Sequence, residues 1–599
     1  MAETMKERKD MDPQYMWDLS TLFKNDEEWN NALPELDEMI KKLPEYQGKL
    51  NNAKTIREFF DFDTHLGRKL SDFYCYASLR NCEDTRDSDA QAMEAKAYQV
   101  YTAYATAISF AEPEILSLDE DVLESIVHSD DLKPYAFNMQ KLLDQKPHVL
   151  SAKEEALLAA FTETLGAPSK ISESLQDADM IFESVTDSNG EVHELNQSNY
   201  ILLQMSEDRT LRLNAFKSFY KGFKQHINTF ASTYNACIKE AVAEAQVRHY
   251  ESSRAMSMAY EHVPGVVYDS LVDTVRKFMP EMYRYVRLRK QMLGLDELHY
   301  YDVYTPLVAG SSKSYTYEEA QQMVLDAVAP LGKDYVNRVK QAYKDRWIDV
   351  YPNNGKRGGA FSSGTYDSNP YILTSFTGTL DSVSTIAHEM GHSQHTWLSN
   401  HTQTPQNADY TLFVAEVAST VNENLLVEQL LQKTTEPKER LALLNHYLEG
   451  FKGTVYRQTM FAEFERDAHA MAERGDAITA ASMNTLYKNL IKDYFGEDLV
   501  IDDEVQYEWA RIPHFYRPFY VYKYATSYCA AVALSEAILN NEEGAVKRYL
   551  EFLSMGGSAY PLDELKHAGV DFSTPEPVSR ALTKFSQILD DVEETLKKL

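Results

Sequence analysis

Three residues near the middle of the chain, His388, Glu389 and His392, have the types and spacing suited to metal-assisted hydrolysis. They lie in the stretch 379–400, TLDSVSTIAHEMGHSQHTWLSN, which predicts one helix with Asp381 as its N-terminal cap. Side chains at i and i+4 project from the same face of a helix, so the two imidazoles can share a divalent ion such as zinc. Glu389 is expected on the shoulder beside them, where it is the candidate general base for an activated water.

The rest of this predicted helix supports a site at the histidines. A third histidine, His395, falls within the same narrow arc of the helix as His388 and His392. The opposite side is apolar and consists of Val383, Ile386, Ala387, Met390, Trp397 and Leu398. Such a helix packs by its apolar side and presents its histidines to a cleft. The bare His-Glu-x-x-His pattern is expected by chance on the order of 0.03 times in such a chain, so this context matters.

A catalytic zinc site needs three protein ligands and one open position. His395 fits by helical phase, but three ligands from one straight helix reach poorly around a single ion. A ligand from a second helix is easier, and the best candidate is Glu416 in the predicted helix 409–431, with Asp409 as its cap. The neighbours of Glu416 are apolar, and a carboxylate there costs free energy unless it is paired or bound to a metal. Glu423, at i+7, either orients a ligand histidine from outside the ligand set or is an ordinary solvated glutamate.

Two segments carry a resemblance to a known family. The sequence HEMGH at 388–392, followed by FVAEVAS at 413–419, resembles the M3 family of zinc metallopeptidases, and specifically its oligoendopeptidase F branch. The resemblance covers the chain from about Tyr200 onward and is looser before it. A mainly helical fold and hydrolysis of short peptides are therefore expected.

The resemblance also implies roles for individual residues. His388, His392 and Glu416 are expected to bind one zinc ion per chain, and Glu389 to activate the water. The resemblance implies that His395, despite its helical phase, is a neighbour of the site and not a ligand. In this expected mechanism zinc polarises the scissile carbonyl and its water, and Glu389 passes the proton to the leaving amine.

The composition is that of a globular protein with more than one core. The chain has 599 residues, of which 25% are charged and 44% hydrophobic. The first residues lack an apolar signal region, and no run of about 18 apolar residues occurs later, so a cytoplasmic location is expected, without a membrane. The four cysteines form no C-x-x-C pair, which excludes a cysteine zinc site and predicts plain buried thiols. They are Cys75, Cys82, Cys237 and Cys529.

The net charge of the chain limits the kinds of molecule that it is expected to bind. The formal net charge is −32, from 92 acidic against 60 basic residues. This balance argues against binding of nucleic acid through its phosphates. It either favours cationic peptides or serves solubility alone. Short peptides are therefore the expected partners, and the sequence predicts no oligomeric state.

The N-terminal part differs in pattern from the rest of the chain. Apolar residues recur at helical spacing over 17–182, whereas 182–196 alternates and contains the hairpin signal Asn189-Gly190. We therefore expect an N-terminal helical lobe over 1–200, ending in a small hairpin, and a catalytic domain over 201–599.

Short strands are expected just upstream of the metal helix. After a predicted long helix over 316–345, the stretches 358–364 and 369–376 read as strands. The first is rich in glycine but lacks the order of a phosphate-binding loop. It is either a structural hairpin or an edge strand that pairs with an extended peptide, as the resemblance implies. The candidate substrate-binding residues are Gly359, Ala360 and Phe361.

The stretch 511–528, RIPHFYRPFYVYKYATSY, is the last that points to chemistry. Peptide hydrolysis develops negative charge on the carbonyl oxygen, and donors placed there stabilise the transition state. The resemblance implies that a histidine followed by tyrosines does this, so His514 is the expected donor, with Tyr522 favoured over Tyr516 as its partner. Three other tyrosines recur at i+4 and read as packing residues: Tyr520, Tyr524 and Tyr528.

The resulting prediction is a mainly α, two-lobed zincin-type metallopeptidase with a small β element beside a deep substrate cleft. It is expected to hydrolyse internal bonds of short peptides. One alternative is a zinc carboxypeptidase or dipeptidyl carboxypeptidase, in which Arg511 or Arg517 would hold the substrate carboxylate. The other is a peptide-binding protein without catalysis, which would not need Glu389.

Overall fold

The structure is a computed structural model that describes residues 5–308 and 313–599, and it is mainly helical, as expected. Its residues group into two compact units, each built from three separate stretches of chain. The first unit contains 1–152, 313–429 and 534–570, and the second contains 153–312, 430–533 and 571–599. These stretches interleave along the chain and do not test the predicted division at residue 200, which stays a prediction. Each unit is described by itself.

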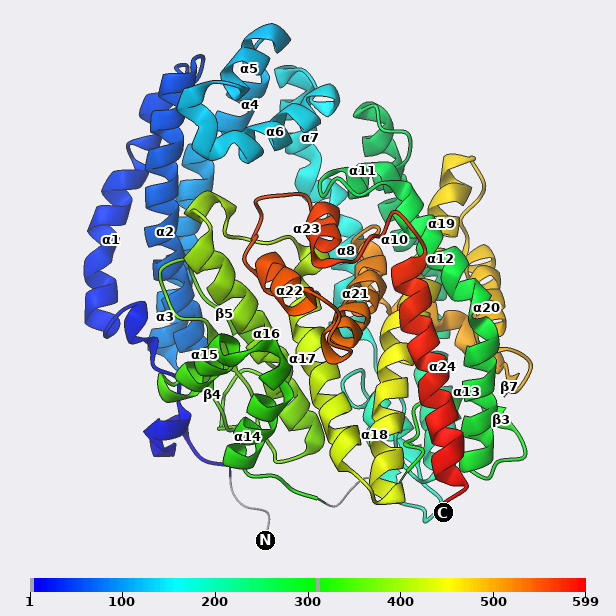
Figure 1. The fold of residues 1–599 in the computed structure, drawn as a ribbon. Helices are drawn as coiled ribbons and strands as arrows, with labels where there is room; N and C mark the ends of the chain where they lie inside the picture. Colours follow the sequence, from blue (N-terminus) through cyan, green and yellow to red (C-terminus); the bar gives the residue numbers. More distant parts are fainter. Residues whose placement is uncertain (1–4, 309–312) are drawn as a thin grey trace. The chain divides into compact units, whose positions relative to one another are not determined.

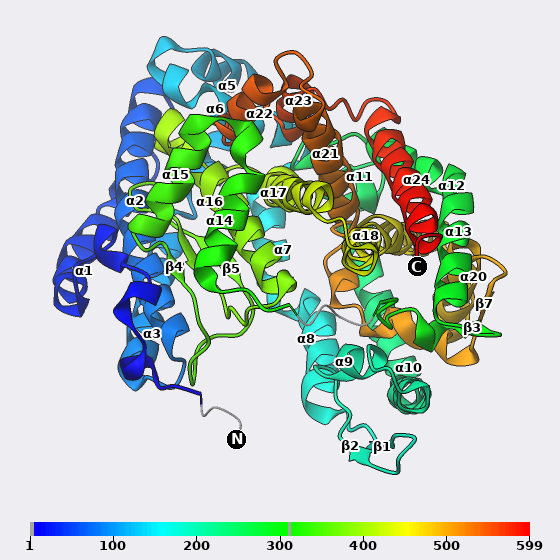
Figure 2. The same ribbon diagram turned by 60° about the horizontal axis from the view of Figure 1, so that its bottom comes forward.

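The first unit consists of helices around one small sheet (Figures 1 and 2). Its N-terminal helices are α1 (Asp26–Ile40), α2 (Ala53–Glu83), α3 (Ser88–Ile108), α4 (Ala111–Leu116), α5 (Glu120–Val127) and α6 (Ala136–Gln145). Its later elements are α14 (Tyr317–Ala327), α15 (Lys333–Lys344), β4 (Ile348–Asp349), β5 (Phe361–Ser363), β6 (Tyr371–Leu373), α16 (Leu380–Thr402), α17 (Leu412–Lys433), α22 (Ala545–Leu553) and α23 (Pro561–Ala568). α17 ends just inside the second unit.

The sheet of the first unit joins the N-terminal helices to α16. β6 is the middle strand, with β4 parallel on one side and β5 antiparallel on the other. Tyr371 and Leu373 of β6 belong to the same buried core as the apolar residues of α1 and α2. β5 therefore lies at a sheet edge and also forms a hairpin with β6, so the structure contains features of both alternatives for the stretch 358–364.

The second unit is also helical, with two very small sheets. Its elements are α7 (Ala152–Leu165), α8 (Ala167–Ser174), β1 (Val185–Thr186), β2 (Val192–His193), α9 (Tyr200–Gln204), α10 (Arg209–Val247), α11 (Ser253–Ala259), α12 (Gly265–Lys277), α13 (Met279–Met292), β3 (Leu298–His299), α18 (Pro437–Gly450), α19 (Arg457–Glu473), α20 (Ala480–Phe495), β7 (Leu499–Val500), α21 (Tyr522–Leu539) and α24 (Glu576–Leu596). α21 continues into the first unit. In both views α24 lies beside α13 and α18.

Two local predictions can be compared directly with the structure. The hairpin at Asn189-Gly190 is confirmed, because β1 pairs antiparallel with β2 and Gly190 has a left-handed φ of +86°. The single long helix over 316–345 is wrong. Pro330 lies in a short 3-10 turn after α14, and Gly332, with φ +96°, is the N-cap of the separate helix α15.

The remaining general expectations concern thiols and membranes. All four cysteines are free and buried, which confirms the prediction of plain buried thiols. Within the described residues, no helix combines the length and the hydrophobicity needed to cross a bilayer.

Candidate active site

The helix that carries the motif, α16, is capped by Thr379 and not by Asp381. The Thr379 side chain accepts a hydrogen bond from the Ser382 N–H, whereas Asp381 lies exposed in the first turn. The predicted apolar side is confirmed, because Ile386 and Met390 are fully buried. The helix is also buried on most of its other faces, so Glu389 lies in the interior and not on a shoulder. Its exposed fraction is 6%.

The second helix, α17, comes unusually close to α16. It begins at Leu412, so Asp409 precedes the helix by three residues and is not its cap. A Cβ atom on Gly391 would lie 2.5 Å from the Ala418 carbonyl oxygen and 2.6 Å from the Ser419 Cα. Only glycine tolerates such an approach of two backbones. The glycine between the two histidines therefore lets α17 bring its carboxylate to them.

A buried amide holds the two helices in this register. The Asn422 side chain on α17 is fully buried, and its Nδ2 donates to the Ala387 carbonyl oxygen of α16 at 3.1 Å. The Tyr335 hydroxyl of α15 donates to the Asn422 Oδ1 at 3.2 Å. Because both polar ends of the amide are satisfied, its burial stabilises one arrangement of the helices.

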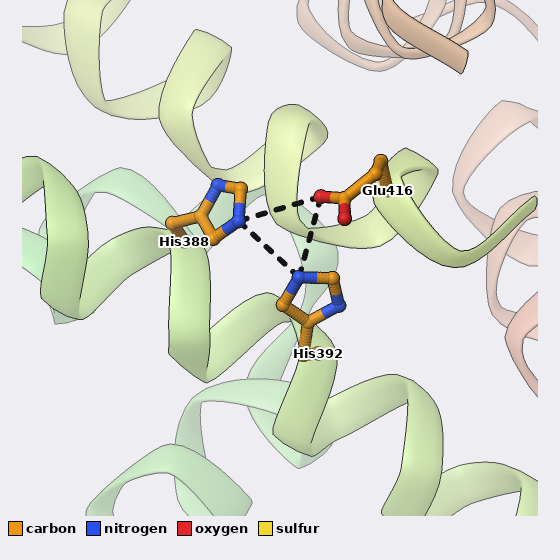
Figure 3. A group of neighbouring side chains, drawn as sticks. All are labelled: His388, His392 and Glu416. Atoms are coloured by element: carbon orange, nitrogen blue, oxygen red, sulfur yellow. Dashed lines mark hydrogen bonds and ion pairs between the residues drawn. The ribbon is translucent and has the colours of Figure 1, made fainter. Parts of the chain in front are cut away.

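The three predicted ligands come together at this junction (Figure 3). The Nε2 atoms of His388 and His392 lie 3.2 Å apart, and each lies 3.4 Å from one carboxylate oxygen of Glu416. Ligand atoms bound to zinc at about 2.0–2.2 Å in a tetrahedron lie about 3.3–3.6 Å from each other. The three donors therefore fit one zinc ion with a position left for a further ligand. The Ser419 hydroxyl donates to the same Glu416 oxygen at 3.1 Å and fixes its position.

The electrostatics of the metal-free site favour positive charge. Burial disfavours protonation of His388, but hydrogen bonds from its ring to Glu416 and Glu423 outweigh this and raise its pKa to about 10. Burial favours the neutral form of Glu416, but its contacts with both histidines lower its pKa well below the usual range. In the absence of metal, the protonated His388 therefore balances the negative charge of Glu416 and Glu423. A divalent cation at the same place would balance these carboxylates instead.

Glu389 is suited to accept a proton. Burial, aided by the nearby carboxylates of Glu416 and Glu423, raises its pKa against the opposing effect of the histidines. A carboxylate whose pKa is raised toward neutrality is a better general base near neutral pH. Glu389 also lies outside the cluster of three ligand atoms, as its assigned role requires.

Glu423 and His395 occupy distinct places beside the ligands. A Glu423 oxygen lies 3.5 Å from the His388 Nδ1, on the side of the ring away from Glu416. His395 is fully buried, and its ring stacks on Tyr410 at 3.7 Å with an interplanar angle of 3°. Burial, together with the nearby His392, lowers the His395 pKa to about 3. His395 is not among the clustered ligand atoms of the described residues.

The predicted substrate strand lies beside the motif helix. The Ser362 hydroxyl of β5 is 2.9 Å from the Ser393 hydroxyl of α16. Gly359 is exposed with φ +85°, Ala360 is half-buried, and the ring of Phe361 packs toward the N-terminal core near Trp17.

His514 lies in the second unit, on the short 3-10 turn Pro513–Tyr516, and is itself exposed. The tyrosine whose hydroxyl lies beside its ring is not the one predicted. The Tyr524 hydroxyl lies 3.4 Å from the His514 Nε2, and the Tyr520 ring lies near-parallel to the imidazole at a centroid distance of 6.1 Å. Tyr522 is fully buried and packs on Tyr268 with ring centroids 5.0 Å apart.

Tyr516 is also turned away from His514. Its hydroxyl lies 2.6 Å from the Thr233 hydroxyl of α10. Between Tyr516 and Tyr522, Phe519 adopts a left-handed φ of +57°, which no periodic pattern anticipates. Tyr524, expected from the sequence to be a packing residue, is the tyrosine whose hydroxyl contacts His514. The i+4 spacing of Tyr520 and Tyr524 was the available signal, but packed residues have the same spacing.

Comparison with known proteins places the chain in a family. Residues 202–584 match peptidase family M3, and residues 114–182 match the description Oligopeptidase F. The chain is similar to Oligopeptidase PepF of Bacillus subtilis, with 43% identity over 100% of this chain and 90% of the relative. It is also similar to Group B oligopeptidase PepB of Streptococcus agalactiae, with 40% identity over 99% and 98% of the two chains.

A solved structure agrees with these relatives. The crystal structure of oligoendopeptidase-F from Enterococcus faecium superposes with a TM-score of 0.75 at 36% identity, covering 96% of this chain and 100% of the other. The family resemblance carried by the motif segments is thereby confirmed. This chain belongs to peptidase family M3.

Proposed function

We propose that this chain is a zinc-dependent endopeptidase that hydrolyses internal bonds of short peptides, acting in the cytoplasm. The observation that carries the proposal is the cluster of His388, His392 and Glu416, with donor atoms spaced for one tetrahedral ion beside the buried Glu389. Membership of the M3 family and similarity to oligopeptidases support the choice of peptide as substrate.

The protein's own residues supply the proton chemistry. When bound, zinc would polarise the substrate carbonyl and lower the pKa of a water. Glu389 takes a proton from the attacking water and delivers it to the leaving nitrogen. Glu423 accepts from the Nδ1–H of His388, which keeps the Nε2 lone pair of that ring directed toward the ligand cluster.

His514 is assigned as a donor to the carbonyl oxygen. The residue is exposed at the surface. Partial burial of its ring, aided by the positive charge of Arg517, lowers the pKa of His514. We assign the partner hydroxyl to Tyr524, because it lies within reach of the His514 Nε2, and not to Tyr522 or Tyr516. Such donors act mainly on the charge that develops in the transition state.

The edge of β5 away from β6, which pairs with no strand of the described residues, is proposed to bind the substrate backbone. Gly359, Ala360 and Phe361 precede or begin this strand, whose other edge is paired with β6. Backbone pairing gives affinity with little dependence on the side chains of the peptide.

Of the two cations that a carboxypeptidase could use to hold the substrate carboxylate, one is already paired. The Arg511 Cζ lies 5.3 and 5.5 Å from the ring centroids of Tyr200 and Phe219. Its guanidinium lies 3.8 Å from the Glu508 carboxylate, so this cation already has an anionic partner. Arg517 is exposed. The relatives named above are oligopeptidases and an oligoendopeptidase.

The test is cleavage of an internally quenched peptide blocked at both ends, with zinc content measured on the same sample before and after chelation. Internal cleavage that follows zinc occupancy at about one ion per chain is expected. Cleavage only after the C-terminus is unblocked would replace the endopeptidase by a carboxypeptidase. Bound zinc without cleavage of any peptide would leave a binding protein.

A further inference from the structure

A cavity within the second unit lies next to the turn that carries His514. Its volume is about 320 Å³, and its walls come from α10, α11 and residues 516–523. This volume is near the lower end of the range of about 300–1,000 Å³ typical of small-ligand sites. It suits a ligand of one or two amino-acid residues.

Four charged side chains line the cavity, and two of them are already paired. Glu244 accepts a hydrogen bond from the Arg248 Nε at 2.9 Å, and the Lys523 Nζ lies 2.5 Å from a Glu261 oxygen. The other two are Glu240 and Arg517. In the part of the chain that the structure describes, neither of these two has an ion-pair partner. Arg517 instead lies over the ring of Tyr520, with its Cζ 4.4 Å from the ring centroid.

The unpaired carboxylate is in an unfavourable place without a cation. Glu240 is half-buried and lies one helical turn from Glu244 on the same side of α10. Burial, aided by Glu244, raises the pKa of Glu240. An ammonium group of a ligand would relieve both effects.

The unpaired guanidinium offers the complementary interaction. Stacking on Tyr520 orients the planar guanidinium while leaving its N–H groups available for a carboxylate. The cavity therefore presents one acceptor for a cation and one donor set for a carboxylate, on different walls.

We propose that this cavity binds a small zwitterion with the chemistry of a free amino acid or dipeptide, its ammonium at Glu240 and its carboxylate at Arg517. Peptide hydrolysis releases such molecules, so a ligand of this kind is a reaction product. The identification of the ligand as a reaction product rests on the proposed endopeptidase function, whereas the charge pattern of the cavity does not depend on it.

The site is joined to the turn of His514 by shared residues. Tyr520 lines the cavity and also lies beside the His514 ring. The turn is held by two further contacts, because the Ser257 hydroxyl donates to the Pro518 carbonyl oxygen at 2.8 Å and the Phe519 N–H donates to the buried Glu465 at 2.7 Å. A bound zwitterion thus contacts a turn whose backbone is already fixed.

The test is calorimetric titration of the dipeptide Ala-Leu into the full-length, zinc-loaded E389Q variant, which cannot consume peptides. Three analogues are titrated in parallel: N-acetyl-Ala-Leu, Ala-Leu amide, and the doubly blocked form. Free Ala-Leu is expected to bind, and removal of either charge to weaken binding at least about tenfold, as for a charge-assisted contact.

Second substitutions locate the two charges. Adding E240Q is expected to weaken Ala-Leu and its amide but not the acetylated form, and adding R517Q to weaken Ala-Leu and its acetylated form but not the amide. D273N and K277Q on α12 are matched controls, since both residues are exposed and neither lines the cavity. These controls are expected to bind every analogue as the parent does.

The proposal would be overturned if Ala-Leu did not bind at millimolar concentration, or if the doubly blocked form bound equally well. It would also be overturned if E240Q or R517Q weakened the analogues with and without the matching charge alike. Insensitivity to both E240Q and R517Q would place the dipeptide on the zinc and would overturn the proposal as well. Failure of the endopeptidase proposal is separate, because it is measured by cleavage of a blocked peptide with the unsubstituted enzyme.

Discussion

The motif helices of the first unit and the His514 turn of the second place their polar groups by different means. In the first, His388, His392 and Glu416 project from two regular helices whose backbones touch at Gly391. In the second, His514 and Tyr524 meet across a turn that contains a left-handed Phe519. Regular helices fix side-chain directions by spacing alone, whereas a turn fixes them by individual backbone angles.

This difference has a practical consequence for substitutions. Changes to the backbone contact between α16 and α17 should act on metal binding and stability together, because the ligands depend on this packing, whereas a change at Glu389 should act on the reaction alone. Changes at the turn should act on the transition state alone, because His514 and Tyr524 contribute nothing to the ligand cluster. Four predictions test that contrast.

The largest effect is expected from E389Q. Glutamine keeps the size of the side chain but cannot accept the proton, so kcat should fall at least about 1,000-fold. Zinc content should stay at one per chain, because Glu389 is not among the clustered donor atoms. Measurement of kcat and of zinc by atomic absorption on one sample decides it. An active variant with full zinc would remove Glu389 from its role.

The next effect separates two tyrosines of the turn region. Y524F is expected to lower kcat about 10- to 100-fold with KM little changed, because it removes a donor to the developing oxyanion. Y522F is its matched control, since that hydroxyl is buried beside Tyr268, and its kcat should stay within about threefold of the parent. Steady-state kinetics on the blocked peptide measures both. A larger loss of kcat in Y522F than in Y524F would assign the donor role to Tyr522.

At the helix junction, G391A is expected to force α16 and α17 apart. The added Cβ would meet backbone atoms at 2.5–2.6 Å, so the free energy of unfolding should fall by about 1–3 kcal/mol. Because the movement separates Glu416 from the histidines, zinc affinity should fall about 10- to 100-fold. Thermal unfolding and chelator competition measure the two effects.

A matched control for that substitution is G67A. Gly67 lies in α2 of the same unit, and no heavy atom would lie within 4 Å of its added Cβ. It should keep zinc affinity and raise stability slightly, by up to about 1 kcal/mol from helix propensity. Equal behaviour of the two variants would show that the close approach at Gly391 does not position the ligands.

The smallest effect concerns pH and zinc removal. In the metal-free protein, the raised His388 pKa of about 10 means that its ion pairs stabilise the fold fully below about pH 6.5 and are lost as pH rises through about 10. Zinc must displace this proton, so its Kd should fall about tenfold per pH unit between pH 7 and 9. The gap in Tm between zinc-loaded and chelated protein should widen over the same range. A constant gap would show that His388 is neutral without metal.

Much of the metal centre could be predicted because it lies on helices. The i, i+4 spacing of His388 and His392, and a carboxylate with apolar neighbours on a second helix, were enough to name the cluster that the structure shows. The two predicted caps were wrong, since capping depends on which side chain reaches the first free N–H groups, and Thr379 does so before Asp381.

Local periodicity does not contain the contacts between distant segments. The closeness of α16 and α17 at Gly391, the burial of Glu389 and the contact of the Tyr524 hydroxyl with His514 are of this kind. The residue types, the helical spacing and the family could be read from the chain alone, because these are properties of neighbouring positions. Which of those side chains share a site depended on the fold, because it is set by how helices pack and by where the backbone turns.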